Sequence, residues 1–194
     1  YTFAKGLRAI LRQDPDVVMI GEIRDVETAQ IGIQASLTGH LVLSTVHTNS
    51  AIAAITRLRD MGIESFLLAS SLRTIISQRL VRRLCLNCCY EEDATNEIAK
   101  LFNLAAGKKI YNSKGCENCT HTGYQGRIAI AECIQVDKVL KDMIHNNSSE
   151  NEISNYVFKD NQSIDQASLG LLINGVTSAE ELIRVGNLKE DANL

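Results

Sequence analysis

What the sequence lacks narrows the functions open to it. No apolar run approaches the roughly 20 residues that a helix needs to cross a bilayer, and no stretch at the amino terminus has the pattern of a secretory signal peptide. Aromatic residues make up only 5% of the chain and the net charge is −3, so the basic, aromatic-rich surface of a nucleic-acid-binding module is missing. We therefore expect a cytoplasmic protein with no transmembrane segment and no nucleic-acid partner.

Apolar residues make up 45% of the 194 residues, which is typical of a globular protein. That length suffices for one core, or for one core with a smaller satellite. The sequence begins at Tyr1 rather than at a methionine and opens directly into helical spacing, so we expect a piece of a longer protein. The six cysteines need an explanation other than disulfides in the reducing cytoplasm.

A short apolar strand followed by a carboxylate is the most informative stretch. Residues 17–20 are apolar at every position and precede Gly21 and Glu22, which predicts a strand buried on both faces, as in a parallel sheet. Asp25 then has the position of a helix N-cap. Ligands of open α/β sheets bind where strands end, and P-loop NTPases place there the acid that handles Mg²⁺ or the attacking water. Taken alone, the stretch also fits an ordinary loop carboxylate.

Two histidines flank the next apolar run, which follows a helix predicted over residues 26–37. Two strands joined by one helix form a parallel βαβ unit, so Glu22 and His47 should reach the same rim of the sheet. His40 lies seven residues before His47, which is roughly 20 Å along a strand at ~3.3 Å per residue. We expect His47 to face a ligand at this rim and His40 to act elsewhere, for example at a subunit contact. A structural hydrogen bond is the alternative for either histidine.

Helical spacing predicts two further helices before the cysteines, over residues 51–61 and 64–83. The second would end in the basic run of residues 78–83, whose charges complement the carboxyl end of a helix dipole. A strand is predicted over residues 127–136. Three capping-box patterns then predict a cap of short helices, and they begin at Ser149, Ser163 and Thr177.

Four of the cysteines form two C-x-x-C pairs, Cys85 with Cys88 and Cys116 with Cys119. Two intervening residues let both sulfurs of a pair turn toward one cation, so the pairs predict a structural Cys₄ zinc site with no open coordination position. The 27 residues between the pairs exceed the usual spacing of about 15–20 and should contain a helix. Reduced thiols or a redox pair are the alternatives. Cys133 lies in an apolar stretch and is expected in the core.

Together these stretches resemble the secretion ATPase superfamily, and within it the ATPases of type II secretion and type IV pilus assembly. The resemblance runs in order along nearly the whole chain. The matching motifs are LRAILRQDPD at 7–16, GEIRD at 21–25, TGHLVLSTVHTN at 38–49, QRL at 78–80, the two C-x-x-C pairs and TGYQGR at 122–127.

The resemblance implies an α/β fold with three parts. Residues 1–84 would form the C-terminal half of a RecA-like P-loop NTPase core, residues 85–126 a tetracysteine zinc-binding element, and residues 127–194 a strand with a small helical cap. ATP, Mg²⁺ and Zn²⁺ are the implied cofactors. The implied assembly is a homo-hexamer at the cytoplasmic face of the inner membrane, docked to secretion or pilus platform proteins.

The resemblance also implies residue roles. Glu22 matches the Walker B glutamate, which acts on the attacking water or on water bound to Mg²⁺. His47 matches the histidine that senses the terminal phosphate, and His40 matches the second histidine of the same nucleotide-binding box. The implied zinc ligands are Cys85, Cys88, Cys116 and Cys119.

One family motif is not in the chain, because no G-x-x-x-x-G-K-[ST] occurs anywhere in it. Without the backbone amides and the lysine of that loop, the charge of the transition state is left uncompensated. We expect the longer parent to hydrolyse ATP and to drive the assembly of a pilus or a pseudopilus, and the 194-residue chain alone to be inactive. The alternative is a non-catalytic, zinc-stabilised docking module.

Overall fold

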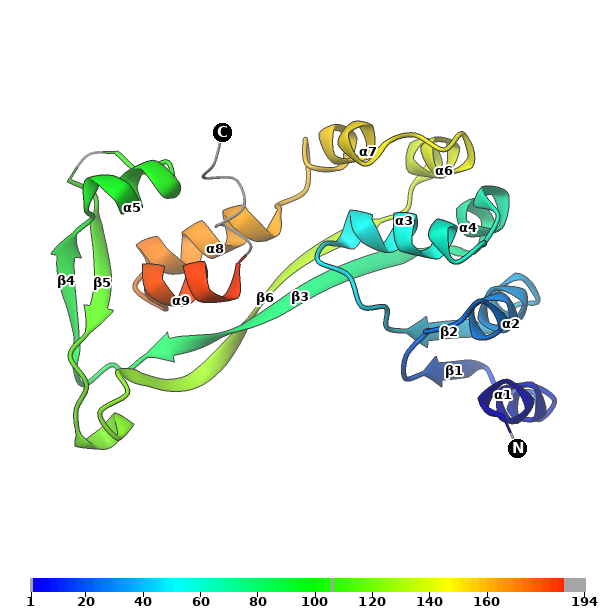
Figure 1. Ribbon diagram of the computed structural model, residues 1–194, viewed down its shortest axis with the longest axis horizontal. Helices are drawn as coiled ribbons and strands as arrows, with labels where there is room; N and C mark the ends of the chain where they lie inside the picture. Colours follow the sequence, from blue (N-terminus) through cyan, green and yellow to red (C-terminus); the bar gives the residue numbers. More distant parts are fainter. Residues whose placement is uncertain (1, 106, 187–194) are drawn as a thin grey trace. The chain divides into compact units, whose positions relative to one another are not determined.

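The computed structural model describes residues 2–105 and 107–186, and they form a mixed α/β fold in two compact units (Figure 1). Unit 1 comprises Tyr1–Ser77 and Cys133–Asn161, and unit 2 comprises Gln78–Glu132 and Gln162–Leu194. Two long strands each run from one unit into the other. No helix in the described part of the chain is long and apolar enough to span a membrane.

Unit 1 opens with the predicted βαβ arrangement. Helix α1 (Phe3–Leu11) leads into β1 (Val17–Ile20), and α2 (Val26–Leu37) connects β1 to β2 (Leu41–Ser44). The strands pair in parallel, which confirms the prediction. The helix also has the predicted bounds and the predicted N-cap, because the Asp25 carboxylate accepts a hydrogen bond from the backbone N–H of Thr28.

The prediction that the first strand is buried on both faces is wrong. Val18 and Ile20 pack against α1 and α2 in a small core, but the side chains between them point the other way. One face of the sheet therefore exposes four apolar side chains, which we call the bare face: Val17, Met19, Leu41 and Leu43. The two helices cover one side only, and parallel sheets are ordinarily covered on both.

Four helices complete unit 1: α3 (Ala51–Asp60), α4 (Ser65–Ser71), α6 (Lys138–His145) and α7 (Glu150–Val157). Their apolar faces form the larger core of the unit, with Ile55, Leu68, Leu140, Ile144 and Ile153 fully buried. Arg59 of α3 connects these helices, because its guanidinium donates to the carbonyl oxygens of Ile144 in the last turn of α6 and of Ser148 in the segment that follows α6.

The predicted helix over residues 64–83 is also wrong, because α4 ends at Ser71 and β3 (Thr74–Leu84) begins three residues later. Two features favour the strand: β-branched residues occupy positions 74–76, and β6 (Tyr124–Gln135) pairs with β3. Cys133 is exposed rather than in the core. It alternates along β6 with the buried Glu132 and Ile134, so it faces the opposite side.

Unit 2 contains a hairpin that the sequence did not predict. Strand β4 (Cys89–Asp93) pairs antiparallel with β5 (Lys109–Ser113). The helix predicted between the cysteine pairs is confirmed as α5 (Asn96–Leu101) and lies between these strands in the chain. A turn of 3₁₀ helix, η1 (Glu117–Cys119), carries the second cysteine pair.

Helices α8 (Ile164–Ile173) and α9 (Ala179–Val185) complete unit 2, and its core includes Val81, Ile110, Ile130, Leu172 and Leu182. The capping boxes that begin at Ser149 and Ser163 are confirmed. The prediction of a capping box that begins at Thr177 is wrong, because Ser178 is the N-cap of α9 and its side chain accepts from the backbone N–H of Glu181, whose carboxylate binds two arginines.

Candidate functional site

The carboxyl ends of β1 and β2 bring Glu22 and His47 together, as the parallel arrangement predicts. Oε1 of Glu22 lies 2.9 Å from Nε2 of His47. The His47 side chain is 87% exposed and that of Glu22 is 20% exposed, so the imidazole lies outermost and the carboxylate sits behind it. The rim can therefore offer an acceptor and a ring nitrogen to the same small ligand.

Thr45, which the sequence analysis did not single out, holds the two loops of this rim together. Its carbonyl oxygen accepts from the backbone N–H of Ile23 at 3.0 Å, and its hydroxyl donates to the carbonyl oxygen of Gly21 at 2.6 Å. These bonds continue the parallel pairing past the last strand residues. Glu22 lies between Gly21 and Ile23, which these two bonds anchor, and is thus held beside the loop that carries His47. A hydroxyl directly after the second strand was the only sequence signal for this role.

Arg24 is the other residue that sequence reasoning missed. Its Nε donates to Oε2 of Glu22 at 2.6 Å, and this bond is the main cause of a lowered pKa of Glu22. The carboxylate is therefore ionised at neutral pH, with Arg24 on one oxygen and His47 on the other. An ionised carboxylate at a strand end can accept a hydrogen bond from water or bind a hydrated cation. In the sequence, the only indication of this role of Arg24 was its position two residues after Glu22.

His40 lies at the opposite end of β2 from His47. Its Nδ1 is 3.0 Å from the carbonyl oxygen of Ala35 and 3.3 Å from Oγ1 of Thr38. Both partners belong to the end of α2 or its C-cap. The ring therefore contacts the carboxyl end of a helix through one carbonyl oxygen and one hydroxyl, and it lies away from the rim that Glu22 and His47 share.

The two C-x-x-C pairs converge in unit 2. The sulfur atoms of Cys85, Cys88, Cys116 and Cys119 all lie within 4.8 Å of one another. Three of the separations are 3.9, 3.9 and 3.8 Å. A tetrahedral zinc–thiolate site with ~2.3 Å bonds has sulfur–sulfur edges of ~3.8 Å. The arrangement therefore has the size and the donor set of a Cys₄ metal site, as the sequence predicts.

Backbone amides prepare one of the sulfurs for a cation. The N–H groups of Cys116 and Gly123 each donate to Sγ of Cys119 at 3.2 Å. Burial raises the pKa of Cys119, but these bonds outweigh it and bring the pKa down to about 6. Burial and the neighbouring thiols raise the pKa of Cys88 to about 12. Four thiolates this close repel one another, so a divalent cation is what would ionise the whole set.

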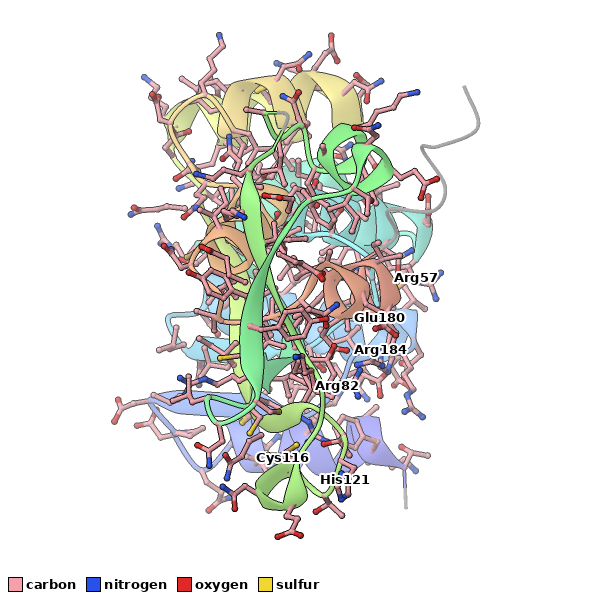
Figure 2. The ribbon with its side chains drawn as sticks, turned by 90° about the vertical axis from the view of Figure 1, so that its left-hand side faces the viewer. Arg57, Arg82, Cys116, His121, Glu180 and Arg184 are labelled. Atoms are coloured by element: carbon pink, nitrogen blue, oxygen red, sulfur yellow. The ribbon has the colours of Figure 1, made fainter. Side chains whose placement is uncertain are left out.

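The loop after the second pair is shaped by unusual backbone angles. Thr120 and His121 both have positive φ, at 52° and 58°, and a side chain at Gly115 would collide with the carbonyl group of His121. This turn leaves the His121 side chain exposed, away from the four sulfurs (Figure 2). The thiol of Cys89, the residue after Cys88, donates to the carbonyl oxygen of Leu86. Neither His121 nor Cys89 therefore belongs to the group of four sulfurs.

Comparisons with known proteins place this chain among the secretion proteins. The family model described as "Type II/IV secretion system protein" matches residues 1–184. The type II secretion system protein E of Aeromonas hydrophila is 53% identical over 186 residues, which cover 95% of this chain and 37% of that protein. The type II secretion system ATPase E of Vibrio cholerae is 52% identical over 186 residues, with the same two coverages. The chain thus spans little more than a third of these relatives.

Two solved structures share the fold. The structure of the pilus retraction motor PilT with bound ADP is similar with a TM-score of 0.67 and 26% identity, over 96% of this chain and 44% of that chain. The ATPase DotB of Legionella pneumophila is similar with a TM-score of 0.65 and 21% identity, over 94% of this chain and 42% of that chain. Because the family model matches residues 1–184, the chain belongs to the type II/IV secretion system protein family.

Proposed function

We propose that this chain is the carboxyl-terminal part of the motor of a type II secretion ATPase, which couples ATP hydrolysis to assembly of a pseudopilus. The pair formed by Glu22 and His47 carries the proposal, because a carboxylate and an imidazole share the carboxyl edge of a parallel sheet, where α/β proteins bind ligands. Its relatives named for type II secretion are about half identical to it. A type IV pilus is the other cargo that the family allows.

In this proposal Glu22 accepts a hydrogen bond from the attacking water or from water on Mg²⁺, and His47 contacts the terminal phosphate. The bond from Arg24 lowers the pKa of Glu22 further below neutrality, and the ionised carboxylate can act as an acceptor at neutral pH. ATP would supply the phosphoryl group, and Mg²⁺ would neutralise part of the negative charge on the phosphates. A role of His40 toward nucleotide remains a prediction from the family resemblance, and its contact with the end of α2 gives it a structural role as well.

The bare face of β1 and β2 supports the interpretation of this chain as half of a RecA-like core. Met19 is 74% exposed there, although parallel sheets are covered on both faces. The remainder of the motor would cover it and would bring the phosphate-binding loop to the rim. Without that loop the chain alone does not hydrolyse ATP. A ring of six copies docked to an inner-membrane platform completes the proposal.

A chimera tests the catalytic part. Residues 1–186 of this chain replace the matching segment of the Vibrio cholerae relative, and ATP hydrolysis is measured for the chimera, for its Glu22→Gln variant and for the matched control Glu97→Gln. Glu97 lies in the first turn of α5 and is exposed. We expect hydrolysis by the chimera and the control, a loss of at least about 100-fold in Glu22→Gln, and none by the 194-residue chain. Equal rates for both variants would refute the role of Glu22.

We also propose that the four cysteines hold a structural Zn²⁺. The sulfur separations fit it, and four protein ligands leave no open position for chemistry. Metal analysis of the purified chain should find one zinc, and Cys116→Ser should lose it and destabilise the region from Cys85 to Cys119. Cys133→Ser, which changes an exposed cysteine on β6, is the control. A chain that contains no zinc and melts unchanged after chelation would exclude the site.

A further inference from the structure

Glu181 of α9 is fully buried, yet it takes no part in the sites described above. It accepts bonds from two arginines. Nε and Nη2 of Arg82 lie 2.9 and 2.7 Å from Oε2, and Arg184 donates from Nε and Nη2 at 2.8 and 2.6 Å. The backbone N–H of Arg82 donates to Oε1 at 2.9 Å. These charge-assisted bonds hold the carboxylate in one orientation.

The same segment of chain is bonded to β3 at three more points. The hydroxyl of Thr177 donates to the carbonyl oxygen of Arg82 at 2.8 Å. The backbone N–H of Leu84 donates to the carbonyl oxygen of Val176 at 2.9 Å. Nη1 of Arg79 donates to the carbonyl oxygen of Val185 at 2.8 Å. We call residues 176–185, with their bonds to β3, the latch.

The latch also reaches β6, the partner strand of β3. The guanidinium of Arg82 lies over the ring of Tyr124 at 4.0 Å from its centroid, which is within the range of a cation–π contact. The hydroxyl of Tyr124 is 2.6 Å from Oγ of Ser178. Because Tyr124 is the first residue of β6 and Arg82 lies near the end of β3, the latch holds the two strand ends together.

The strand ends that the latch holds are also the ends that carry cysteine ligands. Leu84, bonded to the latch, directly precedes Cys85, whose backbone N–H donates to the carbonyl oxygen of Gly123 at 2.9 Å. Gly123 precedes Tyr124 and donates its own N–H to Sγ of Cys119. Figure 2 shows Arg184 and Arg82 beside α9, with Arg82 toward the loop that carries Cys116. One short run of bonds thus links the buried carboxylate with the four sulfurs.

We propose that the latch positions the cysteine ligands, and that Glu181 is the positioning residue on which this depends. The inference rests on the zinc site proposed above. The two cysteine pairs are far apart in sequence, and Cys85 meets Cys116 at 3.9 Å only if the ends of β3 and β6 stay adjacent. Ligands that are ordered before the cation arrives lose less freedom when they bind it. Metal affinity and docking of α9 are therefore coupled in both directions.

Competition with a chelator of known zinc affinity tests the coupling in the 194-residue chain. The variant is Glu181→Gln, which keeps the size of the side chain and removes its charge. The matched control is Glu180→Gln on the neighbouring, exposed position. We expect wild type and control to bind one Zn²⁺ with equal affinity, and Glu181→Gln to bind at least about tenfold more weakly, which is about 1.4 kcal/mol.

Two outcomes separate this inference from the zinc proposal. A wild-type chain that binds no zinc refutes the site itself and the coupling with it. A Glu181→Gln chain that melts at a lower temperature but binds zinc as tightly as wild type leaves the site intact and refutes the positioning role.

Tyr124→Phe provides a second test should Glu181→Gln fail to fold. It keeps the ring beneath Arg82 and removes only the hydroxyl that meets Ser178. We expect Tyr124→Phe to lower the affinity for zinc by less, about threefold. In the wild-type chain we expect the backbone amide of Arg82 to exchange its hydrogen more slowly when zinc is bound. Unchanged affinity in Tyr124→Phe together with zinc-independent exchange of that amide would overturn the proposal.

Discussion

Acid should weaken unit 2 through the buried carboxylate of Glu181. Burial raises its pKa, but the bonds from Arg184 and Arg82 outweigh burial and hold the pKa at about 2, compared with an ordinary value of 4.5. The folded state therefore binds the proton less well than the unfolded state does. Stability from this group is fully present above about pH 5 and is lost as the pH falls toward the folded pKa.

The size of the effect follows from the two pKa values. A tenfold difference in proton affinity is worth ~1.4 kcal/mol, so the charge of Glu181 contributes about 3 kcal/mol to the free energy of unfolding at pH 7 and roughly 1 kcal/mol at pH 3. A glutamine at this position cannot neutralise two guanidinium groups. Glu181→Gln should therefore cost about 3 kcal/mol at neutral pH, and the cost should shrink with acidification.

The assay is urea unfolding of zinc-free, reduced protein at several pH values between 7 and 3. It is followed by the methyl NMR signals of Val81 and Leu182, because both side chains are buried in the core of unit 2. Glu180→Gln is the control, and its difference from wild type should stay small at every pH. A cost of Glu181→Gln that is the same at pH 7 and pH 3 would refute the reasoning, because packing rather than charge would then explain it.

Five further substitutions test the packing. Leu140→Ala in the core of unit 1 should lower the free energy of unfolding by about 2–5 kcal/mol, whereas Val139→Ala on the exposed side of α6 should change it by less than about 0.5 kcal/mol in the same urea titration. Gly123→Ala should cost about 1–2 kcal/mol or more, because φ is +79° and the new methyl group would meet Ser113. Gly170→Ala, in open space within α8, should instead stabilise by up to about 1 kcal/mol in thermal melts. Met19→Ser should leave the melting temperature of this chain nearly unchanged, because Met19 is 74% exposed, and a large drop would show that the bare face is covered.

Local sequence signals predicted the βαβ unit and the cysteine site well. The apolar run of β1, the cap at Asp25 and the length of the connecting helix together require parallel strands, which bring Glu22 and His47 to one rim. The C-x-x-C spacing requires that each pair face one point, and the sulfurs converge as this spacing predicts. These features depend on residues close together in the chain, so the sequence alone is sufficient to predict them.

The errors have one physical origin, because each depends on a partner that is distant in sequence. Residues 74–84 carry a helix-compatible pattern, and pairing with β6 favours the strand β3 over the helix. The same pairing turns Cys133 outward. The burial pattern of β1 depends on what covers each face, and α1 and α2 cover only one. Sequence periodicity reports which side chains are apolar, and it does not report whether another element lies over them.

The sequence by itself determined the family, the rim that joins Glu22 to His47, and the four cysteines that converge, since each is written in short motifs with fixed spacing. Only the tertiary structure decided that Arg24 and Thr45 support the rim and that Glu181 is buried between Arg82 and Arg184. Arg82 and Glu181 are 99 residues apart. An ionisable group acquires its charge state and its role from the side chains that folding brings against it, and no local pattern records them.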